Sequence, residues 1–200
     1  MRRLNPFWHT LTLALLLAVF GWSATARATD LSQPVILVAK PQLGEFYRAT
    51  ILIAKPIGNG QHVGFIINRP TPMTLGKLFP EHGPSQKVLD PVYLGGPTNV
   101  NVIFALVQTT ANPGGHSVKI TDDLFLAMDG EVVDQIIEGD PAHARFFAGL
   151  VAWQPGELQA ELKRGFWYVH DANAADLVLR KPEGLWEELV QRSEIDAKGI

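Results

Sequence analysis

The 200-residue chain contains no cysteine, which excludes disulfides, thiolate metal ligands, a thiol nucleophile and a lipid-anchored cysteine. It also lacks a Gly-x-Ser-x-Gly motif, so the nucleophile elbow of the α/β-hydrolases is absent. The chain has six histidines but no His-Glu-x-x-His motif, which excludes the commonest zinc-protease site. The sequence therefore predicts no catalytic residue, no metal site and no bound cofactor.

The first 28 residues differ in composition from the rest of the chain. Arg2 and Arg3 precede an apolar run over 11–22, and an Ala-Arg-Ala tripeptide ends at Ala28. This order of charge, apolar run and small residues is typical of a secretory signal peptide. A membrane anchor is the alternative, but the run is shorter than the roughly 20 residues that span a bilayer. We expect cleavage after Ala28, export to the periplasm in a Gram-negative bacterium, and no stable membrane anchor after cleavage.

Basic residues are scarce in the remainder of the chain. Removal of residues 1–28 takes away three arginines and no acid, so the formal net charge falls from −3 to −6. The basic clusters that remain are pairs, Lys163-Arg164 and Arg180-Lys181. Nucleic-acid binding depends on Lys and Arg that neutralise phosphates. We therefore expect the partner to be a small molecule or a protein, and not nucleic acid.

Residues 29–200 read as one domain built from short elements, because 14 prolines and 18 glycines interrupt the apolar runs. The runs predict strands over 34–40, 49–54, 62–68, 91–94, 102–107, 118–120, 144–151 and 166–170. Helical spacing predicts helices after Thr74, over 132–137, from Pro155 to Gly165, and over 176–179 and 185–191. The run 69–72 is expected to break the strand pattern, and 80–90 to be a loop. The fold class predicted is α+β, a curled or barrel-like mixed sheet with helices packed outside.

The stretch from Arg145 to His170 is the most regular part of the sequence. An apolar strand leads to a turn at Pro155, a helix follows with Leu158 and Leu162 on its core face, and Gly165 ends it before another strand. Each polar residue of this stretch has a place in a turn, a helix or a strand. The stretch therefore indicates a fold more clearly than it indicates a reaction.

Three groups of residues at predicted strand ends are the ones least explained by packing. They are Asn68-Arg69-Pro70-Thr71, Gly95-Gly96-Pro97 and Asp122-Asp123. Polar corners at strand ends are where binding sites and structural contacts both occur. If the fold brings these strand ends within about 12 Å of one another, they form a polar seam that binds a ligand.

Each group has a second interpretation. Gly95 and Gly96 are either an anion-binding nest of backbone N–H groups or a tight turn that needs positive φ. Asp122 and Asp123 are either a carboxylate pair that binds a cation or exchanges a proton, or a cluster that caps a turn. Arg69 either binds a carboxylate or phosphate, or pairs with one of the two aspartates and holds two loops together.

Six sequence blocks occur in order through nearly the whole of residues 29–200. They are VAKPQL…ATILIAK, GFIINRPT, VYLGGP, VIFALV, ITDDLFLA and FFAGLVAWQPGELQAELKRGFWYV. With these blocks the chain resembles the YqgE/AlgH family of bacterial proteins. The resemblance implies a single α+β domain with a branched mixed sheet that includes a small closed barrel, surrounded by helices. The family's biochemical activity is not established, and the AlgH name comes from an association with transcriptional regulation of alginate production.

The positions that match the family pattern best include most of the three groups. They are Asn68, Pro70, Thr71, Gly95, Gly96, Pro97, Asp122, Asp123, Trp153, Pro155, Gly156 and Trp167. The chain departs from the pattern at Leu150-Val151-Ala152, where the family usually has Tyr-Ala-Gly before the tryptophan. This departure weakens any site built from that tyrosine hydroxyl or from a close backbone approach at the second glycine. A predicted signal peptide is the largest departure, because members of the family typically look cytoplasmic. An exported member cannot act directly on transcription.

We expect a non-enzymatic exported domain that binds a small ligand or a protein. One alternative is a hydrolase-type enzyme that uses Asp122 or Asp123 as a general base, with or without a divalent metal. A second is a regulatory protein of the AlgH type that acts indirectly on transcription. A third is an assembly module, which would carry a contiguous exposed apolar patch in place of a polar cleft.

Overall fold

A computed structural model describes residues 29–171 and 175–199. The predicted signal peptide and its cleavage site at Ala28 lie outside these residues. Within them, the strands are β1 (Val35–Ala39), β2 (Ile51–Gly58), β3 (Gln61–Ile66), β4 (Pro70–Thr74), β5 (Pro91–Leu94), β6 (Thr98–Gln108), β7 (Val118–Thr121), β8 (Leu124–Ala127), β9 (Ala144–Trp153) and β10 (Trp167–Asp171). The α-helices are α1 (Leu75–Leu78), α2 (Gly130–Glu138), α3 (Glu157–Lys163), α4 (Ala175–Leu179) and α5 (Leu185–Lys198). Three 3-10 helices complete this part of the chain, η1 (Glu45–Tyr47), η2 (Gly83–Lys87) and η3 (Pro141–His143).

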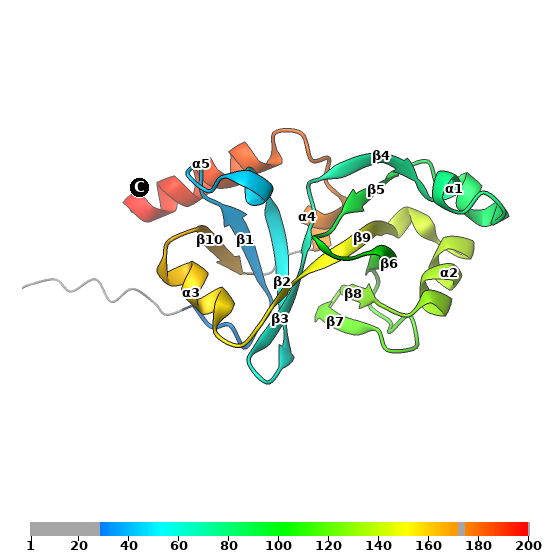
Figure 1. Ribbon diagram of the computed structural model, residues 1–200, viewed down its shortest axis with the longest axis horizontal. Helices are drawn as coiled ribbons and strands as arrows, with labels where there is room; N and C mark the ends of the chain where they lie inside the picture. The colour runs from blue at the N-terminus through cyan, green and yellow to red at the C-terminus, as the bar shows by residue number, and fades with distance from the viewer. Residues whose placement is uncertain (1–28, 172–174, 200) are drawn as a thin grey trace, which may run out of the picture.

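All ten strands of the described residues belong to one branched sheet (Figure 1). Its main path runs β10-β1-β2-β3-β9-β6-β8-β7, and a branch adds β5, parallel to β9, and then β4. The first half of β9 pairs with β6 and the second half pairs with β3, so the sheet divides along this strand. No ladder among the described strands joins the ends of the path. The sheet therefore curls into a half-barrel and is not a closed barrel, and the α+β class is confirmed.

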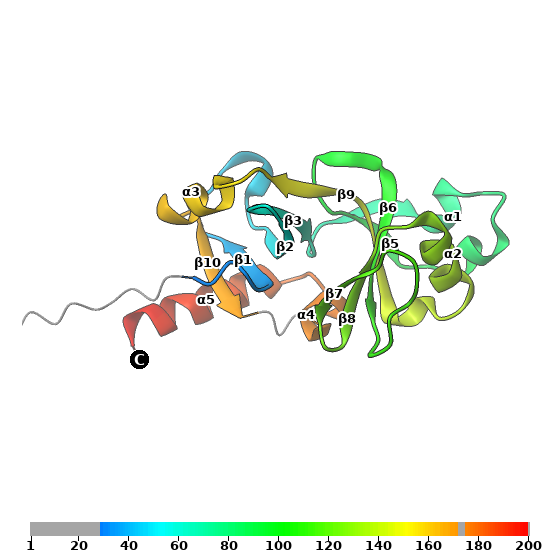
Figure 2. The same cartoon turned by 90° about the horizontal axis from the view of Figure 1, so that it is seen from below.

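Side chains alternate between two cores along the central strands, because successive residues of a strand point to opposite faces. In β1, Ile36 and Val38 join the core beneath α4 and α5, whereas Val35, Leu37 and Ala39 join the core beneath α3. Figure 2 shows α3 and α5 on opposite sides of β1 and β10. Burial on both faces explains why this strand is an uninterrupted apolar run in the sequence.

A third core lies under α1 and α2, against β5, β6, β8 and β9. The carboxylate of Asp129 accepts a hydrogen bond from the backbone N–H of Glu131 at 2.9 Å and caps α2, as its sequence position predicts. The apolar side of α2 then faces the sheet with Val132, Val133, Ile136 and Ile137. Its other side is left for solvent.

The expectation that residues 69–72 break the strand pattern is wrong, because Pro70–Thr74 form β4. This strand lies at the free edge of the branch and pairs only with β5 among the described strands. Proline lacks an N–H, so it is tolerated where one side of a strand has no neighbour. Both Pro70 and Pro72 are exposed at this edge. The expected loop over 80–90 contains η2.

The contact between α5 and β10 carries a titratable group. The Nε2 of His170 lies 2.7 Å from the hydroxyl oxygen of Ser193, and that hydroxyl donates to the carbonyl oxygen of Leu189 at 2.7 Å. Burial lowers the pKa of His170 below its usual 6.5, and the neighbouring Arg192 lowers it further. Asp196 and Asp171 oppose this shift. The folded protein therefore disfavours the charged imidazole.

We predict that the free energy of unfolding falls as the pH is lowered below about 6.5. The unfolded chain binds a proton at His170 in this range before the folded chain does, so acid favours unfolding. Well above the usual pKa of about 6.5, both states are neutral at this residue and the contribution is fully present. Urea unfolding of the protein between pH 5 and pH 8, compared with a His170→Gln variant, measures the effect. An equally steep pH dependence in both proteins would assign it to other groups.

Candidate functional site

The side chain of Asn68 forms hydrogen bonds with the backbone at the beginning of β2. Its side-chain oxygen accepts a hydrogen bond from the N–H of Ile51 at 2.9 Å, and its side-chain nitrogen donates to the carbonyl oxygen of Ala49 at 2.8 Å. Ala49 has a positive φ of 52°, an uncommon conformation for alanine. The Asn68 amide therefore holds the beginning of β2 in place, and both its ends have partners.

Arg69 and Thr71 are likewise bound to backbone. The guanidinium of Arg69 donates to the carbonyl oxygen of Phe46 at 2.6 Å and lies over the Phe46 ring, 4.8 Å from its centre. Burial lowers the pKa of Arg69. The hydroxyl of Thr71 donates to the carbonyl oxygen of Val92 at 2.6 Å. Pro70 lies opposite Tyr93 at the start of β4. Among the described residues Arg69 pairs with neither aspartate, so the interpretation as a link between two loops is wrong.

Gly95 lies where β3, β5 and β9 meet. Its N–H donates to the carbonyl oxygen of Ala148 at 2.9 Å, and its carbonyl oxygen accepts from the N–H of Ile66 at 2.8 Å. One residue earlier, the N–H of Leu94 donates to the carbonyl oxygen of Arg69 at 2.9 Å. The first two predicted groups are therefore neighbours, joined by backbone hydrogen bonds.

The reason for two glycines at 95 and 96 is close backbone packing, and the tight turn with positive φ is wrong. Neither glycine has positive φ, whereas Gly149 on the facing strand has a φ of 73°. A Cβ on Gly96 would overlap the carbonyl group of Leu150, and one on Gly95 would overlap the carbonyl oxygen of Gly149. A Cβ on Gly149 would lie 2.6 Å from the carbonyl oxygen of Gly96. Three glycines thus let the backbones cross at the point where β9 changes partners, and Pro97 follows on the surface.

Asp122 and Asp123 lie in the turn between β7 and β8, in an open cleft of about 640 Å³. Asp122 pairs with the Lys119 ammonium at 2.8 Å and is fully exposed, and the Asp123 carboxylate accepts from the Thr121 hydroxyl at 2.8 Å. Lys55 and Asp171 also line this cleft. The hydrogen bond from Lys119 lowers the pKa of Asp122. The two aspartates are therefore not buried side by side.

The aspartates are not gathered with the other two groups. The carbonyl oxygen of Asp123 accepts from the N–H of Thr109, directly after the last residue of β6. Gly95 bonds to Ala148, which lies opposite Ile103 of the same strand. Ile103 and Thr109 are six residues apart along the chain, or roughly 20 Å in an extended strand. The three predicted groups therefore do not form one pocket.

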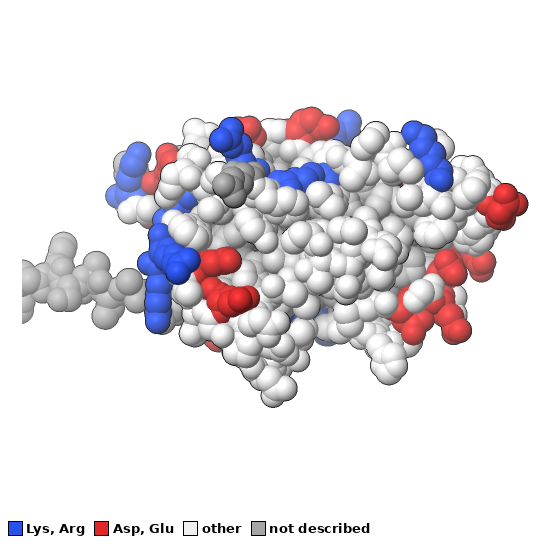
Figure 3. Space-filling view, viewed as in Figure 1, with Lys and Arg blue, Asp and Glu red and all other residues white. Residues whose placement is uncertain are grey.

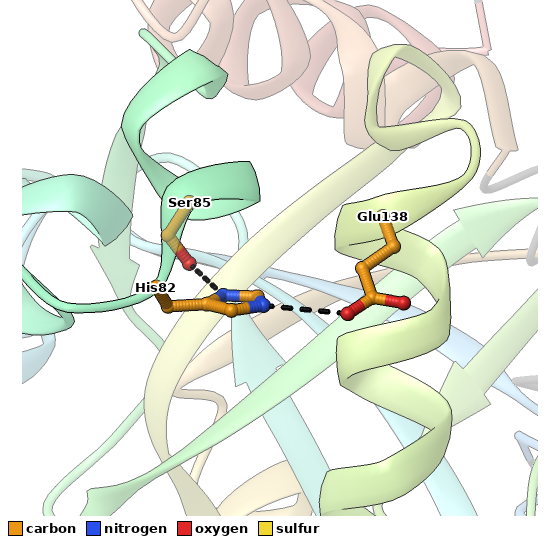
Figure 4. Close-up of polar contacts among 3 residues, drawn as sticks. All are labelled: His82, Ser85 and Glu138. Atoms are coloured by element: carbon orange, nitrogen blue, oxygen red, sulfur yellow. Dashed lines mark hydrogen bonds and ion pairs between the residues drawn. The ribbon is translucent and has the colours of Figure 1, made fainter.

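A serine, a histidine and a glutamate lie in a row between η2 and α2 (Figure 4). The Nδ1 of His82 is 2.8 Å from the Ser85 hydroxyl oxygen, and its Nε2 is 3.5 Å from a Glu138 carboxylate oxygen. Ser85 is fully buried, so no substrate reaches its hydroxyl. The row holds η2 against α2 and cannot act as a catalytic triad. Sequence reasoning missed it because 56 residues separate His82 from Glu138.

The feature that sequence reasoning missed altogether is an apolar groove of about 360 Å³ between β4, α1, β5, β6 and β9. It is lined by Thr71, Met73, Leu78, Phe79, Val92, Val100, Asn101, Ile103 and Ala148. Four of these, Met73, Leu78, Phe79 and Val100, are large apolar side chains with substantial exposure. The sequence signal that could have revealed it is the presence of apolar residues on the solvent-exposed sides of α1 and of the first half of β6, where polar residues are usual.

Charge is distributed unevenly around this groove. In the space-filling view, a broad face over β5 and β6 carries neither Lys, Arg, Asp nor Glu (Figure 3). Acidic side chains gather beside it, over α2. In the described part of the chain, no three His, Asp or Glu side chains are arranged to hold a metal ion. The helices of that part include none with the length and hydropathy to cross a bilayer.

Two solved structures share this fold. A crystal structure of a Corynebacterium diphtheriae protein superposes with a TM-score of 0.66 and 20% identity, over 82% of this chain and 88% of that one. The solution structure of the AlgH protein of Pseudomonas aeruginosa superposes with a TM-score of 0.66 and 22% identity, over 86% of this chain and 91% of that one. At these identities the likeness shows the fold alone.

Similar sequences come from distant bacteria and carry names that state no activity. A UPF0301 protein of Cytophaga hutchinsonii is 28% identical over 173 residues, which cover 84% of this chain and 93% of that protein. A UPF0301 protein of Myxococcus xanthus is 30% identical over 168 residues, covering 82% and 91%. The AlgH-like family model matches residues 36–198. The chain therefore belongs to the AlgH-like family.

Proposed function

We propose that this protein is an exported, non-enzymatic domain that binds a partner protein through its apolar groove. The observation that carries the proposal is the gathering of Met73, Leu78, Phe79 and Val100 around one concave surface. Large apolar side chains around a concave surface are typical of the centres of protein interfaces. Monomeric proteins otherwise leave few such side chains together in solvent.

The cleft that contains Asp122 and Asp123, here called the polar cleft, does not support the hydrolase alternative. A general base that works near neutral pH needs a pKa near the operating pH. The hydrogen bond with Lys119 lowers the pKa of Asp122, away from neutral pH, and the side chain is fully exposed to water. Asp123 is bonded to Thr121. This cleft therefore favours a structural role for both aspartates over the hydrolase alternative.

We predict that a Val100→Glu variant folds normally and loses its partner. Val100 is 51% exposed, so a charge is tolerated there in the free protein but is buried without a counterion in a complex. Ile57, which is 50% exposed at the β2–β3 hairpin, provides the matched control Ile57→Glu. Chemical crosslinking in intact cells, followed by mass spectrometry, compares the two variants with the wild type. The same crosslinked proteins from all three would contradict the groove.

Export is tested in the same cells. We expect the protein in the periplasmic fraction, with an amino terminus at Thr29. Protein found only in the cytosol, with residues 1–28 still attached, would remove export from the proposal while leaving the groove experiment interpretable.

A further inference from the structure

This inference rests on the proposed function and concerns the chemistry of the partner. The exposed side of α2 is acidic, because Glu131, Asp134 and Glu138 face solvent and the helix contains neither Lys nor Arg. Within the described residues, Glu131 and Asp134 form no ion pair, and Glu138 contacts only the His82 imidazole, at 3.5 Å. This helix face therefore has carboxylates that can form ion pairs with Lys or Arg of a partner.

The acidic helix lies beside the groove. Figures 1 and 2 both place α2 next to α1, whose Leu78 forms part of the groove wall. The contact between His82 and Glu138 ties α2 to η2, which packs against α1. Figure 3 shows the acidic side chains over α2 at the border of the uncharged face. Two lysines lie in the elements beside the groove, Lys77 in α1, whose ammonium donates to the carbonyl oxygen of Pro72 at 3.0 Å, and Lys87 in η2.

The backbone at the edge of the groove favours a helical over an extended bound segment. A partner strand could pair with β4, an edge strand that borders the groove, or with the part of β6 that includes Val100 and Asn101, where the β6 ladder is interrupted. Pro70 and Pro72 are exposed on β4 and remove backbone donors, which disfavours strand addition to β4. A helix needs no backbone pairing, because it places apolar side chains from successive turns into a groove.

We propose that the groove binds an amphipathic helical segment of a partner protein, with Lys or Arg beside its apolar face. The apolar side chains of this segment occupy the space between Met73, Phe79 and Val100. Its basic side chains lie against the acidic side of α2. Complementary charges at the rim of an interface increase the association rate and select the partner, whereas the apolar centre provides most of the affinity.

Two synthetic helical peptides test this inference by fluorescence anisotropy with the protein that begins at Thr29. Both carry Leu and Phe at helical spacing, and the remaining positions are Lys in one peptide and Glu in the other. We expect the Lys peptide to bind the wild type and the Glu peptide not to bind. Reversal of two charges, Asp134→Lys with Glu138→Lys, is expected to weaken the Lys peptide about tenfold. The control Glu187→Lys with Glu194→Lys changes the net charge equally on α5 and is expected to leave binding unchanged.

The outcomes separate this inference from the proposed function. If both peptides bind equally and Val100→Glu abolishes the binding, the groove remains the binding surface, and the claim that the partner is basic is wrong. Binding of the Lys peptide that Val100→Glu does not weaken would overturn the groove itself. Failure of both peptides to bind would overturn the helical amphipathic partner. An equal loss in the α5 control would show attraction by overall charge, which also contradicts the inference.

Discussion

Replacement of Gly96 by alanine is expected to destabilise the protein by at least about 3 kcal/mol. The added Cβ would overlap the carbonyl group of Leu150 and the backbone nitrogen of Val151, so no side-chain rotation relieves the clash. The two backbones would have to move apart where β9 changes from pairing with β6 to pairing with β3. Chemical denaturation of the protein that begins at Thr29 measures the loss.

Gly44 provides the control for this experiment. It has no atom within 4 Å of an added Cβ and no positive φ, so Gly44→Ala is expected to change stability by less than about 0.5 kcal/mol. Equal stability of the Gly96→Ala variant and the wild type would mean that the strand crossing is looser than its geometry indicates. The branch of the sheet would then need another explanation.

The second large effect is expected at Glu161, which serves two buried tryptophans. Its carboxylate accepts hydrogen bonds from the indole N–H of Trp153 at 3.1 Å and of Trp167 at 2.8 Å. Both rings are buried in the core beneath α3. A Glu161→Ala variant leaves two buried donors without an acceptor, which costs about 2 to 4 kcal/mol.

Glutamine at this position distinguishes the hydrogen bonds from the packing of the side chain. Both indoles donate to the same oxygen, Oε2, so the amide oxygen of Glu161→Gln can accept from both. The charge is lost, and hydrogen bonds to a charged acceptor are about twice as strong as neutral ones, so the loss of stability is expected to be about half that of Glu161→Ala. Thermal and urea unfolding of both variants measures the difference. Similar losses for glutamine and alanine would assign the effect to charge, and no loss for alanine would show that water replaces the carboxylate.

The regular elements were predictable because their signals are local. The strand that contains Ile36 is buried on both faces, and most residues of the strand that contains Phe147 are buried, so both are apolar runs in the sequence. Asp129 caps a helix that has four buried apolar residues at helical spacing. β4 was not predictable from local propensity, because prolines at 70 and 72 normally end a strand. Its position at a free edge, which only the folded sheet defines, makes them acceptable.

The candidate site was harder to predict than the fold. Asn68, Arg69, Thr71 and Gly95 were identified as unexplained by packing, and the structure gives each a backbone partner. Their partners come from other strands, so sequence alone could not separate a structural contact from a binding group. The pairing of β6 with β8 and β9 then places Asp123 at the far end of β6 from these residues.

One departure from the family pattern, Ala152, has a physical explanation at the strand crossing. The close backbone approach expected to suffer from Ala152 is made instead by Gly149, and Ala152 is exposed. The groove emerges from segments that are distant in sequence, since Met73, Val100 and Ala148 meet only after the sheet has branched. A surface of this kind has no motif of its own in the sequence.

The account is tested most directly by an NMR titration of the isotope-labelled protein that begins at Thr29 with the lysine-bearing peptide. If the peptide binds in the groove, the largest chemical-shift changes are expected at Met73, Leu78, Phe79 and Val100. Changes concentrated instead around Lys119 and the two aspartates of the polar cleft would contradict the account and move the binding surface there.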